Sequence, residues 1–338
     1  MYRFFHRIWY EGSSWYWILL PLSLVFWIVS SVRRALYRNN LLPKVDAGVP
    51  LLVIGNITAG GTGKTPITIW LSERLTERGY RPGIVSRGYG GSGSDASLRV
   101  DSASDAAIVG DEPVLMAKRT GCPVIVDADR GRAAKMLVDE GADIVIADDG
   151  LQHYALHRSY EICVIDGERR LGNRHLLPAG PLRESARRLL SVDQVLINGM
   201  CGDADSTTAE QNALCFELRA GDACRADDSL LRPLEAFAGQ TVNAVAAIGN
   251  PQRFFDLLRG FEIEVLEYPL RDHEAIDLGQ FDHDTPVMMT EKDVVKLKQP
   301  VADNVWYVPV SVHFDPAMAN AWLAQVESRL NDERLRYD

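Results

Sequence analysis

The chain has 338 residues, of which 46% are hydrophobic and 24% are charged, and its formal net charge is −10. This length and composition are typical of a folded protein with one large or two medium-sized domains. The negative charge argues against nucleic acid as the main partner, and the five cysteines form no C-x-x-C pair that would indicate a zinc site.

The N-terminal segment differs from the rest. Residues 12–32 contain no charged side chain, and arginines at 33, 34 and 38 follow them. About 20 helical residues cross the hydrocarbon core of a bilayer. We therefore expect residues 1–38 to form a membrane anchor whose basic end meets anionic headgroups. A helix lying in the interface and a buried core helix remain alternatives, whereas a cleaved signal peptide fits poorly because arginines follow the apolar run.

Residues 51–66, LLVIGNITAGGTGKTP, predict a phosphate-binding P-loop. A buried strand at 51–55 leads into a glycine-rich loop, then Lys64 and Thr65, and a helix begins near Pro66. Lys64 is expected to reach the β- and γ-phosphates of a nucleotide, and the Thr65 hydroxyl to lie on Mg²⁺. The alternative is an ordinary glycine-rich turn. The expected nucleotide-binding residues are Thr58, Gly60, Gly61, Thr62, Gly63, Lys64, Thr65 and Pro66.

Two polar segments follow the P-loop. A short strand at 83–86 leads into the glycine-rich residues 87–94, which begin with Arg87. This segment is either a flexible cover near the phosphates or a surface loop. Further on, Asp111 and Glu112 stand at the start of a helix. Acidic residues are favoured there by the helix dipole in any case, but the pair can also serve Mg²⁺ or an acceptor hydroxyl.

An apolar strand at 143–147 ends in Asp148 and Asp149, with Gln152 and His153 close behind. A carboxylate at the end of such a strand is the Walker B arrangement, which holds Mg²⁺ directly or through water; solvated loop residues are the alternative. Ligands of open α/β sheets bind at the carboxyl ends of the strands. ATP and Mg²⁺ are therefore the expected cofactors.

The pattern predicts an α/β fold, a P-loop NTPase core with a mainly parallel sheet flanked by helices. We expect this core over residues 39–200 and a linker or variable segment over 201–240. Alternating strands and helices over 241–338 predict a smaller C-terminal α/β unit that completes the active-site cleft.

Seven motifs give the chain a family resemblance. In order, they are GNITAGGTGKTP (55–66), SRGYG (86–90), GDEP (110–113), DDGLQH (148–153), LLPAGPLRE (176–184), RDH (271–273) and TEKD (290–293). Together they resemble the tetraacyldisaccharide 4′-kinase family over almost the whole length. Thr58 stands where the strict P-loop pattern has glycine, but it agrees with this family's form of the loop.

The resemblance implies γ-phosphoryl transfer from ATP to the 4′-hydroxyl of a tetraacylated glucosamine disaccharide 1-phosphate, giving lipid IVA at the cytoplasmic side of the bacterial inner membrane. It implies Asp111 as the base, paired with His273, and Glu112 as an aid to Mg²⁺. The expected partners are this lipid and the inner-membrane lipids, with no obligate protein partner. Arginines would meet the acceptor's phosphate. The candidate substrate contacts are Arg87, Arg130, Gln152, His153 and Arg183.

Two other enzyme classes share parts of this pattern. ATP-dependent ligases similar to dethiobiotin synthetase carry a related loop, but they lack the apolar segment and do not account for LLPAGPLRE. Membrane-associated partitioning ATPases have a signature lysine before the glycines, where this chain has Ala59. Both observations favour the kinase.

Overall fold

The computed structural model describes residues 2–88, 96–199, 212–298 and 301–337. Contacts divide the chain into two units, each built from separated segments. The first unit comprises residues 1–87, 129–217 and 313–338, and the second comprises residues 88–128 and 218–312.

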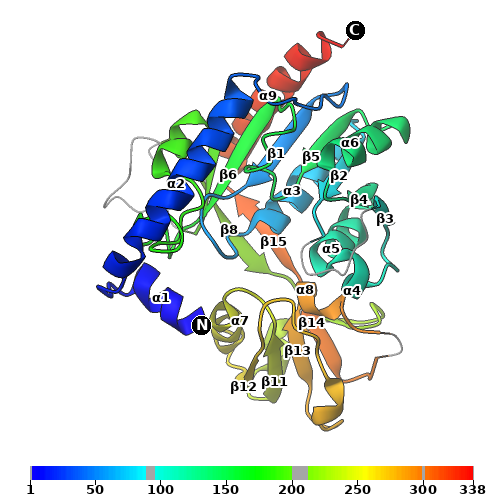
Figure 1. The fold of residues 1–338 in the computed structure, drawn as a ribbon. Helices are drawn as coiled ribbons and strands as arrows, with labels where there is room; N and C mark the ends of the chain where they lie inside the picture. Colours follow the sequence, from blue (N-terminus) through cyan, green and yellow to red (C-terminus); the bar gives the residue numbers. More distant parts are fainter. Residues whose placement is uncertain (1, 89–95, 200–211, 299–300, 338) are drawn as a thin grey trace. The chain divides into compact units, whose positions relative to one another are not determined.

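The first unit is built on a parallel sheet (Figure 1). Its strands lie in the order β15-β8-β7-β6-β1-β5-β2. The pairs on either side of β1, together with β2–β5, β6–β7 and β7–β8, are parallel. Their bounds are β1 Leu51–Gly55, β2 Pro82–Ser86, β5 Ile144–Ala147, β6 Tyr160–Asp166, β7 Gln194–Asn198, β8 Leu214–Ala220 and β15 Val310–Phe314. Every residue of β1 is buried, as expected for a central parallel strand with both faces covered.

Three helices pack around this sheet: α3 (Lys64–Glu77), α6 (Arg130–Asp139) and α9 (Pro316–Arg334). A short 3₁₀ helix spans Ala186–Ser191. The C-terminal helix α9 is fixed to α3 by aromatic packing, because the Trp70 and Trp322 rings stack with centroids 5.7 Å apart. Phe314 contacts both rings. The C-terminal segment therefore supports the helix that follows the glycine-rich loop.

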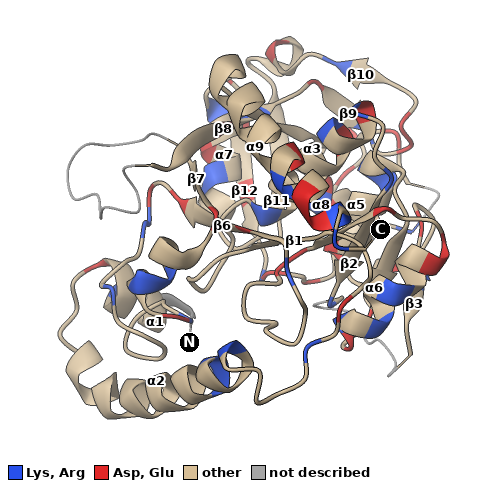
Figure 2. Cartoon of the chain, turned by 90° about the horizontal axis from the view of Figure 1, so that it is seen from above, with Lys and Arg blue, Asp and Glu red and all other residues tan. Residues whose placement is uncertain are grey.

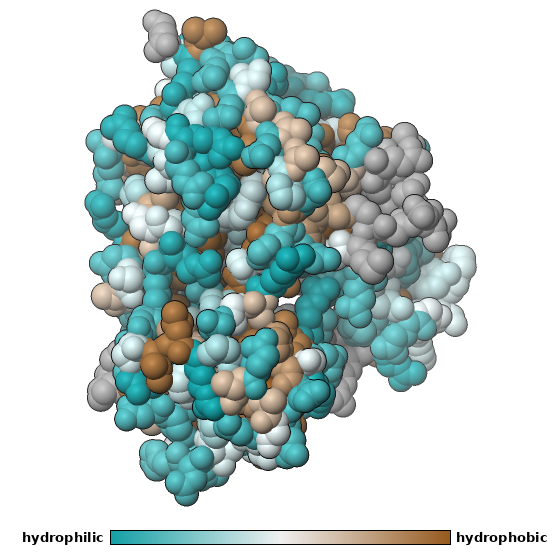
Figure 3. Space-filling model, turned by 180° about the vertical axis from the view of Figure 1, so that it is seen from behind, coloured by the Kyte–Doolittle hydropathy of each residue, from teal (hydrophilic) through white to brown (hydrophobic). Residues whose placement is uncertain are grey.

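The N-terminal helices α1 (Tyr2–Tyr10) and α2 (Tyr16–Arg38) also belong to the first unit. The face of the molecule in Figure 3 is mainly hydrophilic, and its hydrophobic side chains form small groups. Helix α2 is different: most of it carries no charge and basic residues lie at one end (Figure 2). Its exposed large hydrophobic side chains are Trp17, Ile18, Leu22, Leu24, Val25, Trp27, Ile28, Val29 and Val32.

The second unit contains a six-stranded sheet in the order β10-β9-β14-β13-β11-β12. Its parallel strands are β11 Thr241–Ala246, β12 Glu264–Pro269, β13 Val287–Thr290 and β14 Val305–Val308, and the antiparallel ones are β9 Ala223–Arg225 and β10 Leu231–Arg232. The antiparallel pair β3 (Leu98–Val100) and β4 (Val124–Val126) also lies in this unit. Its helices are α4 Ala106–Val109, α5 Asp111–Thr120, α7 Pro251–Arg259 and α8 Glu291–Val294, with 3₁₀ turns at Leu234–Phe237 and Leu278–Gln280.

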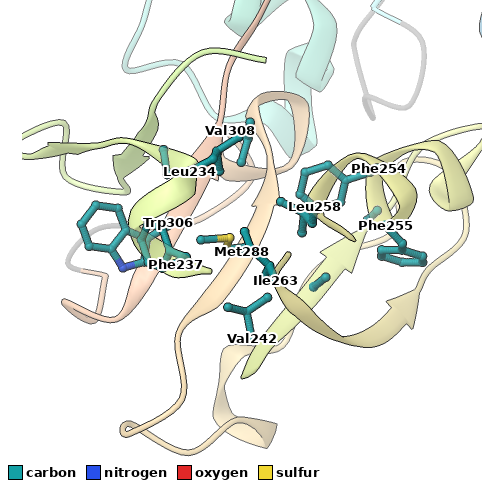
Figure 4. Packing of buried hydrophobic residues seen from close by; sticks show 13 residues of the cluster. Leu234, Phe237, Val242, Phe254, Phe255, Leu258, Ile263, Met288, Trp306 and Val308 are labelled. Carbon is teal, nitrogen blue, oxygen red and sulfur yellow. The ribbon is translucent and has the colours of Figure 1, made fainter. Parts of the chain in front are cut away.

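The core of this second sheet is apolar and continuous (Figure 4). Phe255 and Leu258 of α7 pack with Val242 of β11 and Met288 of β13. Phe237 meets Trp306 edge to face, with ring centroids 5.3 Å apart. Burial of aromatic and branched side chains of this kind is the main stabilising term of a small α/β unit.

The division of the chain differs from the contiguous segments expected from the sequence. Residues 88–128, expected in the P-loop core, group with 218–312, and residues 313–338 group with the first unit. Of the expected linker, residues 214–240 form β8, β9, β10 and a 3₁₀ turn, while 201–211 lie outside the described residues. Residues 89–95 of the expected glycine-rich cover also lie outside them. Boundaries are hard to predict when a chain leaves and re-enters a unit.

Candidate active site

The glycine-rich loop joins β1 to α3 in a conformation that requires glycine. Gly60 and Gly63 have φ of 103° and 97°, in the left-handed region that other residues rarely adopt. Space is limited as well. A Cβ on Gly63 would lie 2.9 Å from the Asn198 amide nitrogen, and one on Gly60 would lie 3.1 Å from the Arg169 guanidinium. The loop backbone can therefore approach a ligand closely.

This loop offers several groups to an anion. Gly63 precedes α3 without a side-chain cap, so the N–H groups of the first helical turn are left for an external acceptor. The Thr62 hydroxyl is buried and, among the described residues, has no hydrogen-bond partner. Lys64 lies in the first turn of α3, and its amino group is 3.5 Å from Asp149 Oδ1. These groups fit a nucleotide's phosphates.

Asp148 and Asp149 follow β5, which pairs directly with β1. Asp148 is only 1% exposed and accepts a 2.9 Å hydrogen bond from the Thr68 hydroxyl of α3. Asp149 has a φ of 46°, a strained conformation that its surroundings must hold. Arg183 lies 3.4 Å from its carboxylate, and Arg130 donates to its carbonyl at 2.9 Å.

The charge on Asp149 is well defined. Burial by itself would raise the pKa of this carboxyl, but the positive charges of Lys64, Arg183 and Arg130 outweigh burial and lower its pKa below the ordinary value of 3.8. Asp149 is thus an anion at neutral pH, held between cations at the mouth of the loop.

The oxygen atoms near the loop fit Mg²⁺ that arrives with a nucleotide. The candidates are the Thr65 hydroxyl in the first turn of α3 and the carboxylates of Asp148 and Asp149. Within the described parts of the chain, no cluster of three or more His, Cys, Asp or Glu side chains could hold a metal by itself. Mg²⁺ characteristically uses one or two carboxylates together with substrate phosphates and water.

Gln152 is already hydrogen-bonded within the protein, and His153 is half-buried. The Gln152 amide donates to Asn56 O at 3.0 Å and to the Glu184 carboxylate at 2.9 Å, so it holds the residue just before the loop. Burial, followed by nearby arginines, lowers the pKa of His153 to about 4, which keeps the ring neutral. Arg87, at the end of β2, is exposed. The substrate role of these residues stays a prediction.

In the second unit, Asp111 and His273 form a close pair. Asp111 begins α5 and is 3% exposed. The Nδ1 atom of His273 lies 2.9 Å from each carboxylate oxygen of Asp111. His273 has a φ of 65°, so this pair also contains a strained backbone. The hydrogen bond that His273 Nδ1 donates to the Asp111 carboxylate raises the pKa of His273 above 6.5.

Two lysines complete this cluster. Lys296 is 3.5 Å from Asp111, and Lys292 is 3.0 Å from Glu112. Burial alone would raise the pKa of Asp111, but the His273 hydrogen bond and the charges of both lysines lower it. The sequence interpretation gave neither lysine a role. Lys292 lies inside the TEKD motif and Lys296 one helical turn later, so the motif carried a usable signal.

A model of the family described as Tetraacyldisaccharide-1-P 4'-kinase, LpxK, matches residues 15–328. The chain belongs to this family. It is 46% identical to a tetraacyldisaccharide 4'-kinase of Shewanella amazonensis, over 96% of this chain and 95% of that protein. It is also 46% identical to the enzyme of the same name from Nitrosococcus oceani, over 90% of this chain and 89% of the relative.

The fold agrees with a solved LpxK structure. The LpxK of Aquifex aeolicus, crystallised in complex with ATP, matches with a TM-score of 0.78 and 25% identity, covering 93% of this chain and 99% of that one. Membership of the LpxK family confirms the resemblance drawn from the seven motifs. The expectation of a P-loop kinase fold with a mostly parallel sheet is likewise confirmed.

Two residues at the LpxK phosphate loop were not predicted. The Asn198 amide, at the end of β7, donates to Thr62 O at 3.3 Å, and the Arg169 guanidinium donates to Gly61 O. Both reach the loop from segments more than 100 residues further along the chain. No local pattern marks them, because only the parallel sheet brings the ends of β6 and β7 beside β1.

Proposed function

We propose that this chain is an ATP-dependent kinase that transfers the γ-phosphoryl group to the 4′-hydroxyl of tetraacyldisaccharide 1-phosphate, giving lipid IVA in lipid A biosynthesis. The family match over residues 15–328 carries this proposal. The geometry of the glycine-rich loop supports it independently, because the loop offers uncapped N–H groups, a buried free hydroxyl and a lysine at one helix N-terminus. Such a site stabilises the charge of a transferred phosphoryl group.

The first unit would bind and polarise the nucleotide. Lys64 moves from Asp149 to the phosphates, and the loop N–H groups hold the nonbridging oxygens. Bound Mg²⁺ would supply further charge neutralisation, held by Thr65 and by Asp148 or Asp149. Arg183 and Arg130 keep Asp149 in place. Arg183 and Arg87 are also candidates to contact the acceptor's own phosphate.

The second unit would supply the base. Asp111 accepts the proton of the acceptor hydroxyl, while the Nδ1–H of His273 fixes the orientation of the carboxylate. The lowered pKa of Asp111 keeps it ionised at neutral pH. Glu112 and Lys292 form the adjoining ion pair, 3.0 Å apart. We assign Glu112 an auxiliary role toward Mg²⁺. Its carboxylate would leave the ion pair with Lys292 to take up this role.

The bacterial inner membrane is the proposed location, with the protein held by its N-terminal helices and acting from the cytoplasmic side. Helix α2 is long and apolar enough to cross a bilayer by length and composition. However, between residues 16 and 34 its less exposed positions (16, 19, 20, 23, 26, 30, 31 and 34) form one stripe along the helix. The stripe meets the first unit near both ends, through Tyr16 on His175 and Arg34 on Ser191.

This stripe favours a helix that lies in the membrane interface. Between its contacts at His175 and Ser191, the first unit carries the charged segment 183–188. If α2 spanned the bilayer in this arrangement, this charged segment would be drawn into hydrocarbon, which costs several kcal/mol per charge. Lying flat, the helix presents its opposite, apolar face to lipid. A thiol-specific reagent that cannot cross membranes tests this in inverted vesicles. Ser14→Cys and Asn39→Cys, at exposed positions just beyond the two ends of α2, should both react from the cytoplasmic side. Protection of one until the vesicles are opened would indicate a spanning helix.

The function itself is tested with γ-labelled ATP and the acylated disaccharide phosphate. Label should appear in the lipid fraction for the wild type and not for Lys64→Ala. Label that accumulates only as free phosphate would indicate an ATPase and overturn the proposal. A sample without the acceptor gives the background of hydrolysis.

A further inference from the structure

The helix that faces lipid is hydrogen-bonded to a loop that holds the phosphate-binding loop. We name residues 175–184 the connecting loop. On one side it contacts α2, where Ser23 is the only buried residue, at 5% exposure. The Ser23 hydroxyl donates to Leu176 O at 2.8 Å and accepts from Ala179 N at 3.0 Å. A buried serine in an apolar helix, bonded on both sides, is placed for a specific contact.

On its other side, the connecting loop pairs with the start of the glycine-rich loop. Ala59 N donates to Pro181 O at 2.8 Å, and Arg183 N donates to Ile57 O at 2.7 Å. Thr58 and Leu182 form an antiparallel bridge between these bonds. The backbone position of residues 57–59 therefore depends on residues 181–183, which begin two residues after Ala179, the nearer contact of Ser23.

A second route joins the same two places. Arg34 lies 3.9 Å from the Glu184 carboxylate, and Glu184 accepts from Gln152 at 2.9 Å. Gln152 in turn donates to Asn56 O at 3.0 Å. Both routes run from α2 to residues 56–59, all within the first unit. Helix α1 adds a tether to the connecting loop, since Trp9 Nε1 donates to Pro178 O at 2.9 Å.

We propose that Ser23 is a positioning residue for the ATP site: through the connecting loop, it ties the seating of α2 to the geometry of the phosphate-binding loop. The proposal rests on the proposed function only in taking ATP as the nucleotide. Ser23 touches no reacting group. Its loss leaves the buried Ala179 N–H without this acceptor, whereas Leu176 O keeps the bond from Gly180 N, so the connecting loop shifts or loosens at Ala179.

The test measures ATP binding without any acceptor, so it does not depend on the identity of the lipid substrate. Ser23→Ala should weaken ATP affinity about threefold to tenfold, the effect of one buried hydrogen bond, and hasten amide exchange at Ala59 and Arg183. Ser30→Ala is the matched control, because among the described residues the Ser30 hydroxyl bonds only to Phe26 O and Trp27 O of its own helix. Its ATP affinity and exchange should match the wild type.

Sedimentation with vesicles of phosphatidylethanolamine and phosphatidylglycerol should be the same for both variants. If Ser23→Ala binds ATP and exchanges amides like Ser30→Ala, the proposal is wrong. It is equally wrong if only vesicle binding falls, because Ser23 then serves the anchor alone. Should Ser23→Ala fail to fold, Trp9→Phe removes the tether to Pro178 O instead and should weaken ATP affinity in the same direction. Unchanged affinity there would overturn the proposal.

Discussion

The two units carry candidate sites of opposite construction. The phosphate-binding loop is made mainly of backbone, and its buried Thr62 hydroxyl has no partner among the described residues. The Asp111 cluster is made of side chains that already neutralise one another, since His273, Lys292 and Lys296 surround two carboxylates. The loop is thus completed by a ligand, whereas the cluster sets the charge and basicity of its own members.

The largest effect is expected from removing the charge of the loop. Lys64→Ala should lower kcat on the order of 10³-fold, because it deletes a preorganised cation at the transferred phosphoryl group. Steady-state kinetics with labelled ATP measure this. Lys135→Ala, at an exposed position of α6, controls for loss of a lysine. Near wild-type turnover in Lys64→Ala would remove this lysine from the mechanism.

Removing the proposed base should cost slightly less. Asp111→Asn keeps the shape of the side chain but cannot accept a proton, so we expect a loss of about 10²- to 10³-fold in kcat. ATP affinity should change little. The matched control is Asp256→Asn on α7, since Asp256 is in an exposed pair with Arg259. A variant that lost ATP affinity with kcat retained would show that the cluster serves nucleotide binding.

The backbone character of the loop predicts a third, smaller effect. Gly63→Ala adds a Cβ that would lie 2.9 Å from Asn198, so we expect the KM for ATP to rise about tenfold or more. Gly79→Ala is the informative control, because Gly79 also has a positive φ, of 86°, but open space around its Cβ position. It should lose about 1 kcal/mol of stability and keep its KM. Equal KM values would show that crowding at the loop is unimportant.

The fourth prediction concerns pH. The raised pKa of His273 stabilises the pair below pH 6.5, and this contribution is lost as pH rises through that raised value. The lowered pKa of Asp111 stabilises the folded state fully above pH 3.8. This stabilisation is lost as the pH falls through the lowered pKa. His273→Gln removes the imidazole that lowers the pKa of Asp111. Burial, the largest influence on this carboxyl, then raises its pKa with less opposition. The acid limb of kcat/KM should therefore move to higher pH.

A pH–rate profile of His273→Gln measures this shift, with His283→Gln as the control at an exposed histidine of the same unit. We expect about a tenfold loss of kcat/KM at the acid end of the range. An unmoved acid limb would mean that His273 does not govern the ionisation of Asp111.

The same contrast decides what could be predicted from the sequence. The phosphate-binding loop is contiguous, so glycine spacing and Lys64-Thr65 identify it without further information. The pairing of Asp111 with His273 spans 162 positions, and only the family resemblance pointed to it. Asn198 and Arg169 were missed because tertiary packing alone brings them to their sites. The short strands β9 and β10 have only three and two residues, too few for a periodic signal.

The discontinuity of the units has a practical consequence for making fragments. The chain passes between the units near residues 87, 128, 217 and 312, and the last two crossings fall within β8 and β15. No single cut therefore yields either unit whole. An expression fragment of the second unit needs Ala128 joined to Leu218 by an engineered linker. A clone that simply ends at residue 312 would lack α9 and leave Trp70 without its stacking partner.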